Sequence, residues 1–167
     1  MMRIGIITAS DKGARSERED LSGPALKELV EEMAWEVVEY VILPDDQALL
    51  EKTMRRWVDE LGLDLIFTTG GTGFSLRDVT PEATLAVADR FVPGIAEVMR
   101  QESLKVTPKA MLSRAVAVLR KQTLIINMPG SLKAVRECFA AISPALPHGL
   151  QILKGEASEC GSPPKSN

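Results

Sequence analysis

The chain has 167 residues, a common size for one domain and enough to bury a core without cross-links. Hydrophobic residues make up 45% and charged residues 26%, and the net charge of -3 at pH 7 lacks the basic excess of nucleic-acid-binding proteins, so we expect no nucleic-acid partner. No apolar run is long enough to cross a membrane, and two cysteines are too few for a disulfide framework, so we expect a cytoplasmic protein without membrane contact.

The first quarter of the chain predicts a strand, a helix and a second strand. Arg3–Ala9 is apolar and β-branched, as expected of a buried strand. After a polar loop, Ser22 is expected to cap a helix that has Pro24 in its first turn. Glu36–Leu43 is the second predicted strand, and Asp45 then occupies the expected N-cap position of the next helix.

The middle of the chain continues the alternation. A third strand is predicted at 63–69 and ends at consecutive glycines. Thr80, followed by proline and glutamate, is expected to cap another helix, and a further helix is expected at 95–104. Strands at 115–119 and 123–127 flank a short polar turn, so they predict a hairpin that adds antiparallel strands to the sheet.

The pattern as a whole predicts an α/β protein. A last helix is expected at Leu132–Ile142, and residues 156–167, rich in Ser, Gly, Pro and Lys, are expected to form a disordered tail. Alternating strands and helices favour a three-layer α/β/α domain over residues 1–155, with a mostly parallel, doubly wound sheet and the added antiparallel hairpin.

Four loops at the strand ends hold most of the chemically interesting residues. In a doubly wound sheet, ligands bind beyond the carboxyl ends of the strands. The candidate binding residues at these ends are Ser10, Asp11, Thr69, Gly70, Gly71, Thr72, Gly73, Arg77, Asn127, Pro129, Gly130 and Ser131. Asp20 is a further candidate to line the same crevice.

The Gly-Gly-Thr-Gly segment at 70–73 suggests phosphate binding, because glycines let backbone N–H groups approach an anion closely. A P-loop is excluded, since no Gly-Lys pair occurs in the chain, and the Rossmann fingerprint lacks its third glycine, where Leu76 stands. A tight strand-to-loop turn without a ligand explains the glycines equally well. The segment 127–131 (NMPGS) is a second candidate anion site, with a plain turn before the helix as the alternative.

Two acidic residues accompany the glycine loop. Asp78 lies just downstream beside Arg77, and Asp45 follows a neighbouring strand. Carboxylates beside a phosphate site can hold Mg²⁺, and Mg²⁺ neutralises the charge of a polyphosphate. The competing interpretations are that Asp45 is only an N-cap and that Asp78 only pairs with Arg77. Together, the pair predicts magnesium-dependent phosphoryl or nucleotidyl chemistry.

These residues are similar to those of a known family, the MogA-type molybdopterin adenylyltransferases, which the G domains of Cnx-type plant proteins and of gephyrin also represent. The matching segments are 69–73 (TGGTG), 77–84 (RDVTPEAT), 127–131 (NMPGS) and 146–148 (LPH). The similarity extends from Arg3 to about Leu153. Met128 and Leu132 depart from the residues usual in the family, leucine and proline, and neither departure alters a charge.

The resemblance implies a molybdopterin-binding-domain fold, a homotrimer, and Mg²⁺-dependent adenylylation of molybdopterin by ATP in molybdenum cofactor biosynthesis. The expected products are adenylyl-molybdopterin, handed to a molybdate-insertion enzyme, and pyrophosphate. Asp45 and Asp78 match the essential acids of the family and are the expected catalytic and Mg²⁺-binding residues. Two alternatives stay open: a non-catalytic molybdopterin-binding module, either MoaB-like or a scaffold, and a different nucleotide-handling enzyme.

Overall fold

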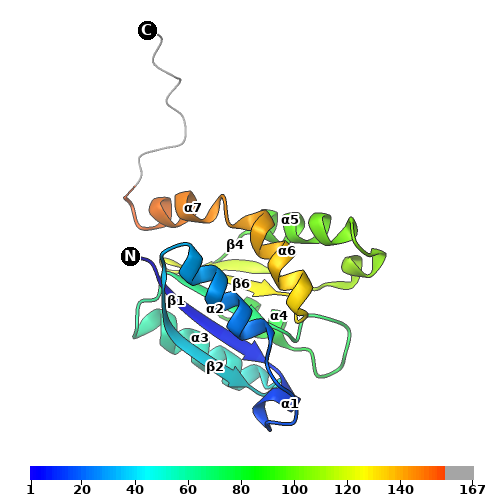
Figure 1. The fold of residues 1–167 in the computed structure, drawn as a ribbon. Coiled ribbons are helices and arrows are strands. Elements are labelled where there is room, and N and C mark those ends of the chain that lie inside the picture. Colours follow the sequence, from blue (N-terminus) through cyan, green and yellow to red (C-terminus); the bar gives the residue numbers. More distant parts are fainter. Residues whose placement is uncertain (157–167) are drawn as a thin grey trace.

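The computed structural model describes residues 1–156, so the predicted tail lies, apart from Glu156, outside the described residues. Along the chain, the elements in Figure 1 are β1 (Arg3–Ala9), α1 (Asp11–Ala14), α2 (Ser22–Glu32), β2 (Glu36–Leu43), α3 (Gln47–Asp59), β3 (Leu65–Thr69), α4 (Thr80–Ala86), β4 (Arg90–Phe91), α5 (Pro93–Leu104), the 3-10 helix η1 (Pro108–Leu112), β5 (Ala117–Arg120), β6 (Thr123–Met128), α6 (Leu132–Ile142) and α7 (Leu146–Leu153).

The strands form one six-stranded sheet in the order β2-β1-β3-β6-β5-β4. β1 pairs in parallel with β2 and β3, and β3 pairs in parallel with β6. The predicted hairpin is present as β5 and β6, which pair in the antiparallel sense. Of its two strands only β5 runs against the parallel strands, because β6 is itself parallel to β3. β4 pairs with β5 in the antiparallel sense at the edge of the sheet. Every residue of β6 is buried, as expected for a central strand covered on both faces.

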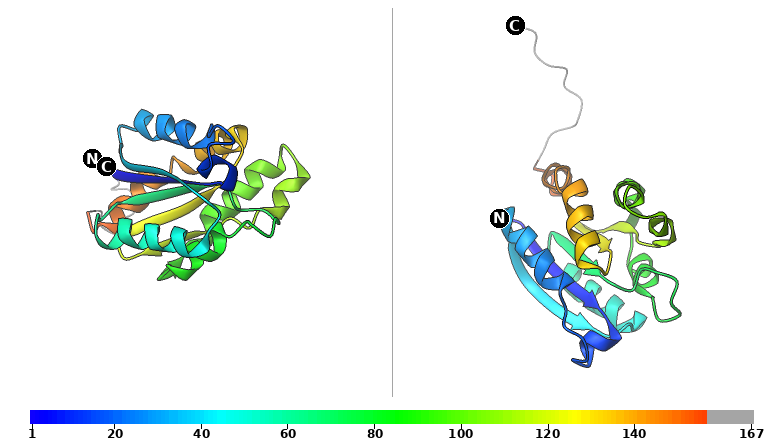
Figure 2. Two further views of the ribbon diagram at one scale, coloured as in Figure 1. Left: turned by 90° about the horizontal axis from the view of Figure 1, so that it is seen from below. Right: turned by 45° about the vertical axis from the view of Figure 1, so that its right-hand side comes forward.

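Helices cover both faces of the sheet, which confirms the three-layer α/β/α class. In the left view of Figure 2, the sheet lies between α2 on one side and α3 on the other. One apolar core joins the sheet to α2, α5, α6 and α7, and a second core joins it to α3 and α4. Successive residues of a strand point to opposite faces, so Ile6 and Phe67 enter the first core while Ile7 and Ile66 enter the second.

The prediction that Asp45 caps a helix is wrong. The N-cap of α3 is Asp46, whose side chain accepts a hydrogen bond from the backbone N–H of Leu49. A cap side chain accepts from the backbone N–H two or three residues further along the chain, and Asp46 stands three residues before Leu49. Asp45 therefore does not cap α3.

Two other predicted caps are also wrong. Ser22 is the first residue of α2 rather than its cap, and the Asp20 carboxylate accepts from the backbone N–H groups of Ser22 and Gly23 instead. Thr80 is likewise the first residue of α4, with Val79 at the N-cap position and no side-chain cap bond. Ser131, in contrast, caps α6 as expected, by accepting from the N–H of Ala134.

Four elements were not predicted: α1, β4, η1 and α7. The first three have two to five residues each, too short to show a periodic apolar pattern. α7 begins beside a proline and contains a glycine, both poor helix formers in a helix interior, and it is held by packing of Leu146 and Leu150 into the first core. Among residues 1–156, no helix is long and apolar enough to span a membrane.

Candidate functional site

A cleft of about 370 Å³ lies at the carboxyl ends of β1, β3 and β6. Apart from Asp20, eight of the fourteen candidate residues line it: Ser10, Asp45, Thr69, Gly70, Gly71, Asp78, Gly130 and Ser131. The other six lie outside its lining: Asp11, Thr72, Gly73, Arg77, Asn127 and Pro129. The cleft is also lined by the segment before α2, including Arg18 and Asp20. Loops from distant parts of the sequence therefore converge on one site.

The two candidate anion loops are in contact with each other. Gly70 has a φ of +91°, and a Cβ there would lie 2.4 Å from the Ala9 carbonyl oxygen. A Cβ on Gly130 would lie 3.3 Å from the Cα of Gly70. Side chains at these positions would fill the space where the backbones approach, so the glycines keep backbone groups of both loops at the cleft. The N-terminus of α6, capped by Ser131, opens into the same cleft and favours an anion there.

Asp45 and Asp11 exchange two hydrogen bonds, each from the backbone N–H of one residue to the side-chain carboxylate of the other. The Asp11 N–H donates to Asp45 Oδ2 at 3.0 Å, and the Asp45 N–H donates to Asp11 Oδ1 at 3.0 Å. The other carboxylate oxygen, Oδ1, is buried and has no hydrogen-bond partner in the described part of the chain. Burial raises the pKa of Asp45, and the negative charges of Asp11 and Asp78 raise it further. An acceptor left in this state costs folding energy, as expected of a group reserved for a ligand.

Arg77 pairs with Asp11 rather than with Asp78. Its Nε donates to Asp11 Oδ2 at 2.8 Å and its Nη2 donates to Asp11 Oδ1 at 3.0 Å. The bidentate hydrogen bonds from Arg77 lower the pKa of Asp11 to about 2. The interpretation of Asp78 as a partner of Arg77 is therefore wrong.

Asp78 reaches the cleft from the loop 70–79. Its Oδ2 accepts from the backbone N–H of Ser75 at 3.0 Å. Its carbonyl oxygen accepts from Nη2 of Arg114 at 2.7 Å. Arg114 lies 36 residues away along the chain, and no sequence motif marks it. The contact is visible only after β5 has paired with β6.

Asn127 does not face the cleft. Its side chain is fully buried, where Nδ2 donates to the hydroxyls of Thr68 and Thr84 at 2.9 and 2.8 Å. Its Oδ1 accepts from the N–H of Val116 at 3.2 Å. The Asn127 side chain is therefore engaged within the core, where it holds β6 in place, and it does not line the cleft for which Asn127 was a candidate.

Asp20 forms one wall of the cleft and is held by a polar cluster. Its Oδ2 accepts from Thr8 Oγ1 and from the Tyr40 hydroxyl, both at 2.5 Å. Burial alone would raise the pKa of Asp20, but the hydrogen bonds from Thr8 and Tyr40, with those from the start of α2, lower it. Burial and the bond to Asp20 raise the pKa of Tyr40 to about 12. Thr8 and Tyr40 come from neighbouring strands and carry no motif by which the sequence could have marked them.

The acids of the cleft suit a magnesium ion that a substrate shares. Within residues 1–156, no group of three or more His, Cys, Asp or Glu side chains could hold a metal ion. Asp45 and Asp78 nevertheless both line the cleft, and Asp45 Oδ1 is an uncommitted hard oxygen. Mg²⁺ is commonly held by one or two carboxylates together with substrate phosphates. The donor set therefore fits Mg²⁺ bound with a nucleotide.

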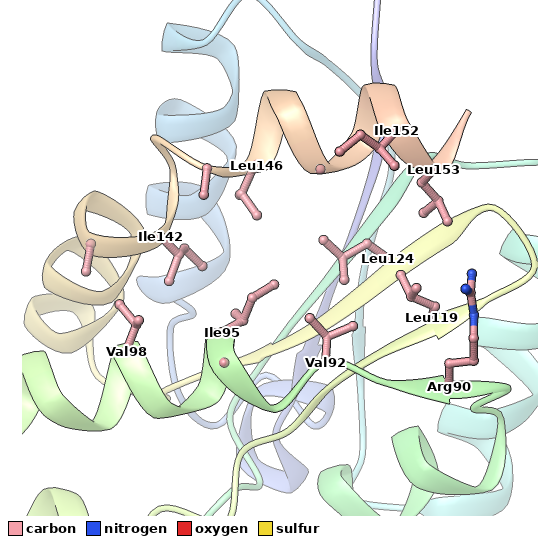
Figure 3. Close-up of a pocket in the computed structure, with 14 residues that line it drawn as sticks. Arg90, Val92, Ile95, Val98, Leu119, Leu124, Ile142, Leu146, Ile152 and Leu153 are labelled. Atoms are coloured by element: carbon pink, nitrogen blue, oxygen red, sulfur yellow. The ribbon is translucent and has the colours of Figure 1, made fainter. Parts of the chain in front are cut away.

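A larger cavity, of about 680 Å³, lies elsewhere and has a different character. Figure 3 shows apolar side chains from α5, α6, α7 and the adjoining strands around it. Arg90 is the one charged residue among those that line it. This groove has no acidic side chains or glycine loops that could bind a metal ion or phosphate, so the smaller, polar cleft is the candidate site.

The comparisons with known proteins agree with one another. A family described as a probable molybdopterin binding domain matches residues 5–148. A molybdopterin adenylyltransferase of Helicobacter pylori (strain J99) is 44% identical over 156 residues, which cover 92% of this chain and 89% of that protein. One from Escherichia coli (strain K12) is 42% identical over 168 residues, covering 92% and 86%. The crystal structure of the molybdopterin biosynthesis enzyme MoaB from Thermus thermophilus is 48% identical with a TM-score of 0.89, and the match covers 95% of this chain and all of that one (100%).

Proposed function

This chain belongs to the family of probable molybdopterin binding domains, and we propose that it transfers the adenylyl group of Mg-ATP to molybdopterin. The protein is a molybdopterin adenylyltransferase of molybdenum cofactor biosynthesis, like its relatives in Helicobacter pylori and Escherichia coli. ATP as the nucleotide and Mg²⁺ as the metal are the more specific parts of the proposal.

One observation carries these specific parts. Asp45 presents a buried, unpartnered carboxylate oxygen next to Gly71, in the cleft that Asp78 also lines. A Cβ on Gly71 would lie 2.9 Å from that oxygen, so only glycine leaves its surroundings open. A buried carboxylate oxygen without a hydrogen-bond partner contributes nothing to stability. Its position beside backbone groups suited to phosphate supports a role with a metal-bound polyphosphate.

Catalysis in this cleft rests on alignment and charge. The terminal phosphate of molybdopterin is the nucleophile, and it attacks the α-phosphorus of ATP in line while pyrophosphate leaves. The substrate brings its own nucleophile, so no covalent enzyme intermediate is needed. The backbone groups at Gly70, Gly71 and Gly130 and the N-terminus of α6 would hold phosphates.

The carboxylates complete the arrangement. Asp45 and Asp78 would hold Mg²⁺, which supplies neutralisation of the developing charge on the phosphates. The salt bridge between Arg77 and Asp11 orients the Asp11 backbone N–H that donates to Asp45, so this pair would position the Asp45 carboxylate. Direct contact of Arg77 with substrate is not needed for that effect.

The decisive assay is adenylyl transfer from ATP to purified molybdopterin, followed by product mass and pyrophosphate release. We expect transfer that EDTA abolishes and Mg²⁺ restores. Asp78→Asn should remove the activity, whereas Asp46→Asn, the same change at the exposed cap of α3, should leave it intact. Near-native turnover of Asp78→Asn would remove Asp78 from the mechanism. Binding of molybdopterin without transfer in the wild type would favour the non-catalytic module.

The second anion loop has a separate test. Gly130→Val should weaken molybdopterin binding, because its Cβ already meets the Cα of Gly70 at 3.3 Å and the larger side chain must enter the cleft. Titration of the variant with molybdopterin measures this directly. Unchanged binding would place the pterin or its phosphate elsewhere.

We further propose a cytoplasmic homotrimer that hands its product to a molybdate-insertion enzyme. What supports self-association is the apolar groove of Figure 3, whose rim includes Val98 and Ile152, both more than two-fifths exposed. Apolar surfaces of this kind usually mark a protein contact. Light scattering of the purified protein tests the trimer.

A further inference from the structure

The loop 70–79, which carries Asp78, is weakly held by its own residues. It contains no helix or strand, and its internal hydrogen bonds centre on Ser75 and Asp78. The Asp78 N–H donates to the Ser75 carbonyl oxygen at 2.9 Å, and the Ser75 N–H donates to Asp78 Oδ2 at 3.0 Å. Phe74 is 69% exposed and Leu76 is 99% exposed, so apolar packing does not anchor the middle of the loop. Outside that middle part, Val79 packs against the second core and Arg77 pairs with Asp11. A segment of this kind opens readily unless something outside it supplies contacts.

Arg114 supplies those contacts from the segment between η1 and β5. Its Nε donates to the carbonyl oxygen of Gly73 at 2.7 Å, and its Nη2 donates to the carbonyl oxygen of Asp78 at 2.7 Å. Nη1 donates to the Glu82 carboxylate, in the first turn of α4. The Arg114 backbone N–H also donates to the carbonyl of Thr72 at 2.9 Å. One residue thus holds the start and the end of the loop and the helix that follows.

The chemistry of the contact requires arginine. A guanidinium presents five N–H donors in a fixed planar fork, whereas a lysine ammonium is a single flexible point charge. The three acceptors are served by three different nitrogens, Nε, Nη1 and Nη2, and the single nitrogen of a lysine cannot replace them. Glu82 pairs with the positive charge, so that charge is already engaged and Arg114 is not a spare cation for a substrate phosphate.

The same segment also ties the loop to the centre of the sheet. Val116, two residues after Arg114, donates its N–H to Asn127 Oδ1 and accepts from the Asn127 N–H at 3.0 Å. Asn127 lies in β6 and is the first residue of the second anion loop. Arg114 therefore connects the loop that carries Asp78 to the strand that leads to Gly130, and both Asp78 and Gly130 line the cleft.

We propose that Arg114 is a positioning residue for adenylyl transfer, which fixes the backbone of Asp78 so that its carboxylate faces the cleft, without touching either substrate. The proposal rests on the adenylyltransferase function for its catalytic consequence. Its structural core, that Arg114 orders residues 72–79, is independent of the reaction.

The test compares Arg114→Ala and Arg114→Lys with Arg120→Ala. Arg120 is the matched control, because like Arg114 it pairs with a carboxylate and donates to a backbone carbonyl. Its partners are Asp59 and the carbonyl of Val87, and it lies outside the cleft lining. In Arg114→Ala we expect the amides of 72–79 to exchange hydrogen at least about tenfold faster. We expect kcat to fall about 100-fold, while KM for molybdopterin stays within about twofold.

Rescue separates positioning from general damage. Added guanidinium should restore part of the kcat of Arg114→Ala, and Arg114→Lys should fall between Arg114→Ala and the wild type. Arg120→Ala should lose stability while its loop exchange and kcat stay at wild-type values. Unchanged loop exchange in Arg114→Ala, or an equal loop effect in Arg120→Ala, would overturn the proposal. A wild-type protein that transfers no adenylyl group would refute the proposed function, and the exchange data would still decide whether Arg114 orders the loop.

Discussion

Replacing Asp45 by asparagine should abolish adenylyl transfer and, at neutral pH, stabilise the fold. The wild-type carboxylate is partly buried, leaves Oδ1 without a partner in the described residues, and faces the negative charges of Asp11 and Asp78. Asparagine keeps an acceptor for the Asp11 N–H and removes the charge. Its amide can also donate toward Thr80 Oγ1, a buried hydroxyl that has no partner within residues 1–156. The two groups are neighbours, because a Cβ placed on Gly71 would lie within 3 Å of both Thr80 Oγ1 and Asp45 Oδ1.

The size of the gain follows from the unmet acceptor. Leaving a buried polar group unsatisfied costs about 1–3 kcal/mol, and we take about 1 kcal/mol because Asp45 also borders the cleft. For a chain of this size, that raises the melting temperature by about 2–4 °C. Since the folded-state pKa of Asp45 is raised above 3.8, the wild type loses stability as pH rises from 3.8 through that pKa. The stability advantage of the variant should therefore be smallest below pH 3.8 and grow as the pH rises through the raised pKa of Asp45.

Urea unfolding at several pH values measures the stability, and the adenylyl-transfer assay measures the activity. Asp46→Ala is the control with the opposite result, because it removes the cap of α3 and should cost about 1 kcal/mol while activity persists. If Asp45→Asn is less stable than the wild type at pH 7, or if it retains turnover, the carboxylate is not reserved for a ligand.

Three further results are expected. Because the pKa of Asp11 is depressed to about 2, the wild type should lose stability in urea unfolding as the pH falls from 3.8 towards 2. Arg77→Gln should lose less stability over that window, and an equal loss would show that Arg77 is not what depresses the pKa of Asp11. Gly70→Ala should lower the free energy of unfolding by about 2–5 kcal/mol, because Gly70 has a φ of +91° and a Cβ there clashes with the backbone. Gly62→Ala should lower it by only about 1–2 kcal/mol, because Gly62 has a φ of +61° but lies in open space. Equal losses in urea unfolding would show that the clash at Gly70 is relieved. Ile152→Glu should give folded monomers in light scattering, and a persistent trimer would move the subunit contact away from the groove.

The candidate site was predictable as far as local pattern reached. Glycine spacing and the acids at strand ends pointed to one edge of the sheet, and eight of those residues do line the cleft, because parallel strands bring their carboxyl ends together. Which atom each side chain offers was not predictable. Asn127 belongs to the expected loop, yet its amide is fully used by Thr68, Thr84 and Val116 inside the core.

The alternation of strands and helices, the fold class and the family could all be inferred from the sequence, since each depends on residues close together in the chain or on a continuous motif. Three features became clear only from the folded chain: which of two neighbouring acids caps α3, the pairing of Arg77 with Asp11 across 66 positions, and the contact of Arg114 with Asp78 across 36. These choices depend on hydrogen bonds whose partners become neighbours only when the strands pair, and no local spacing encodes such a distance.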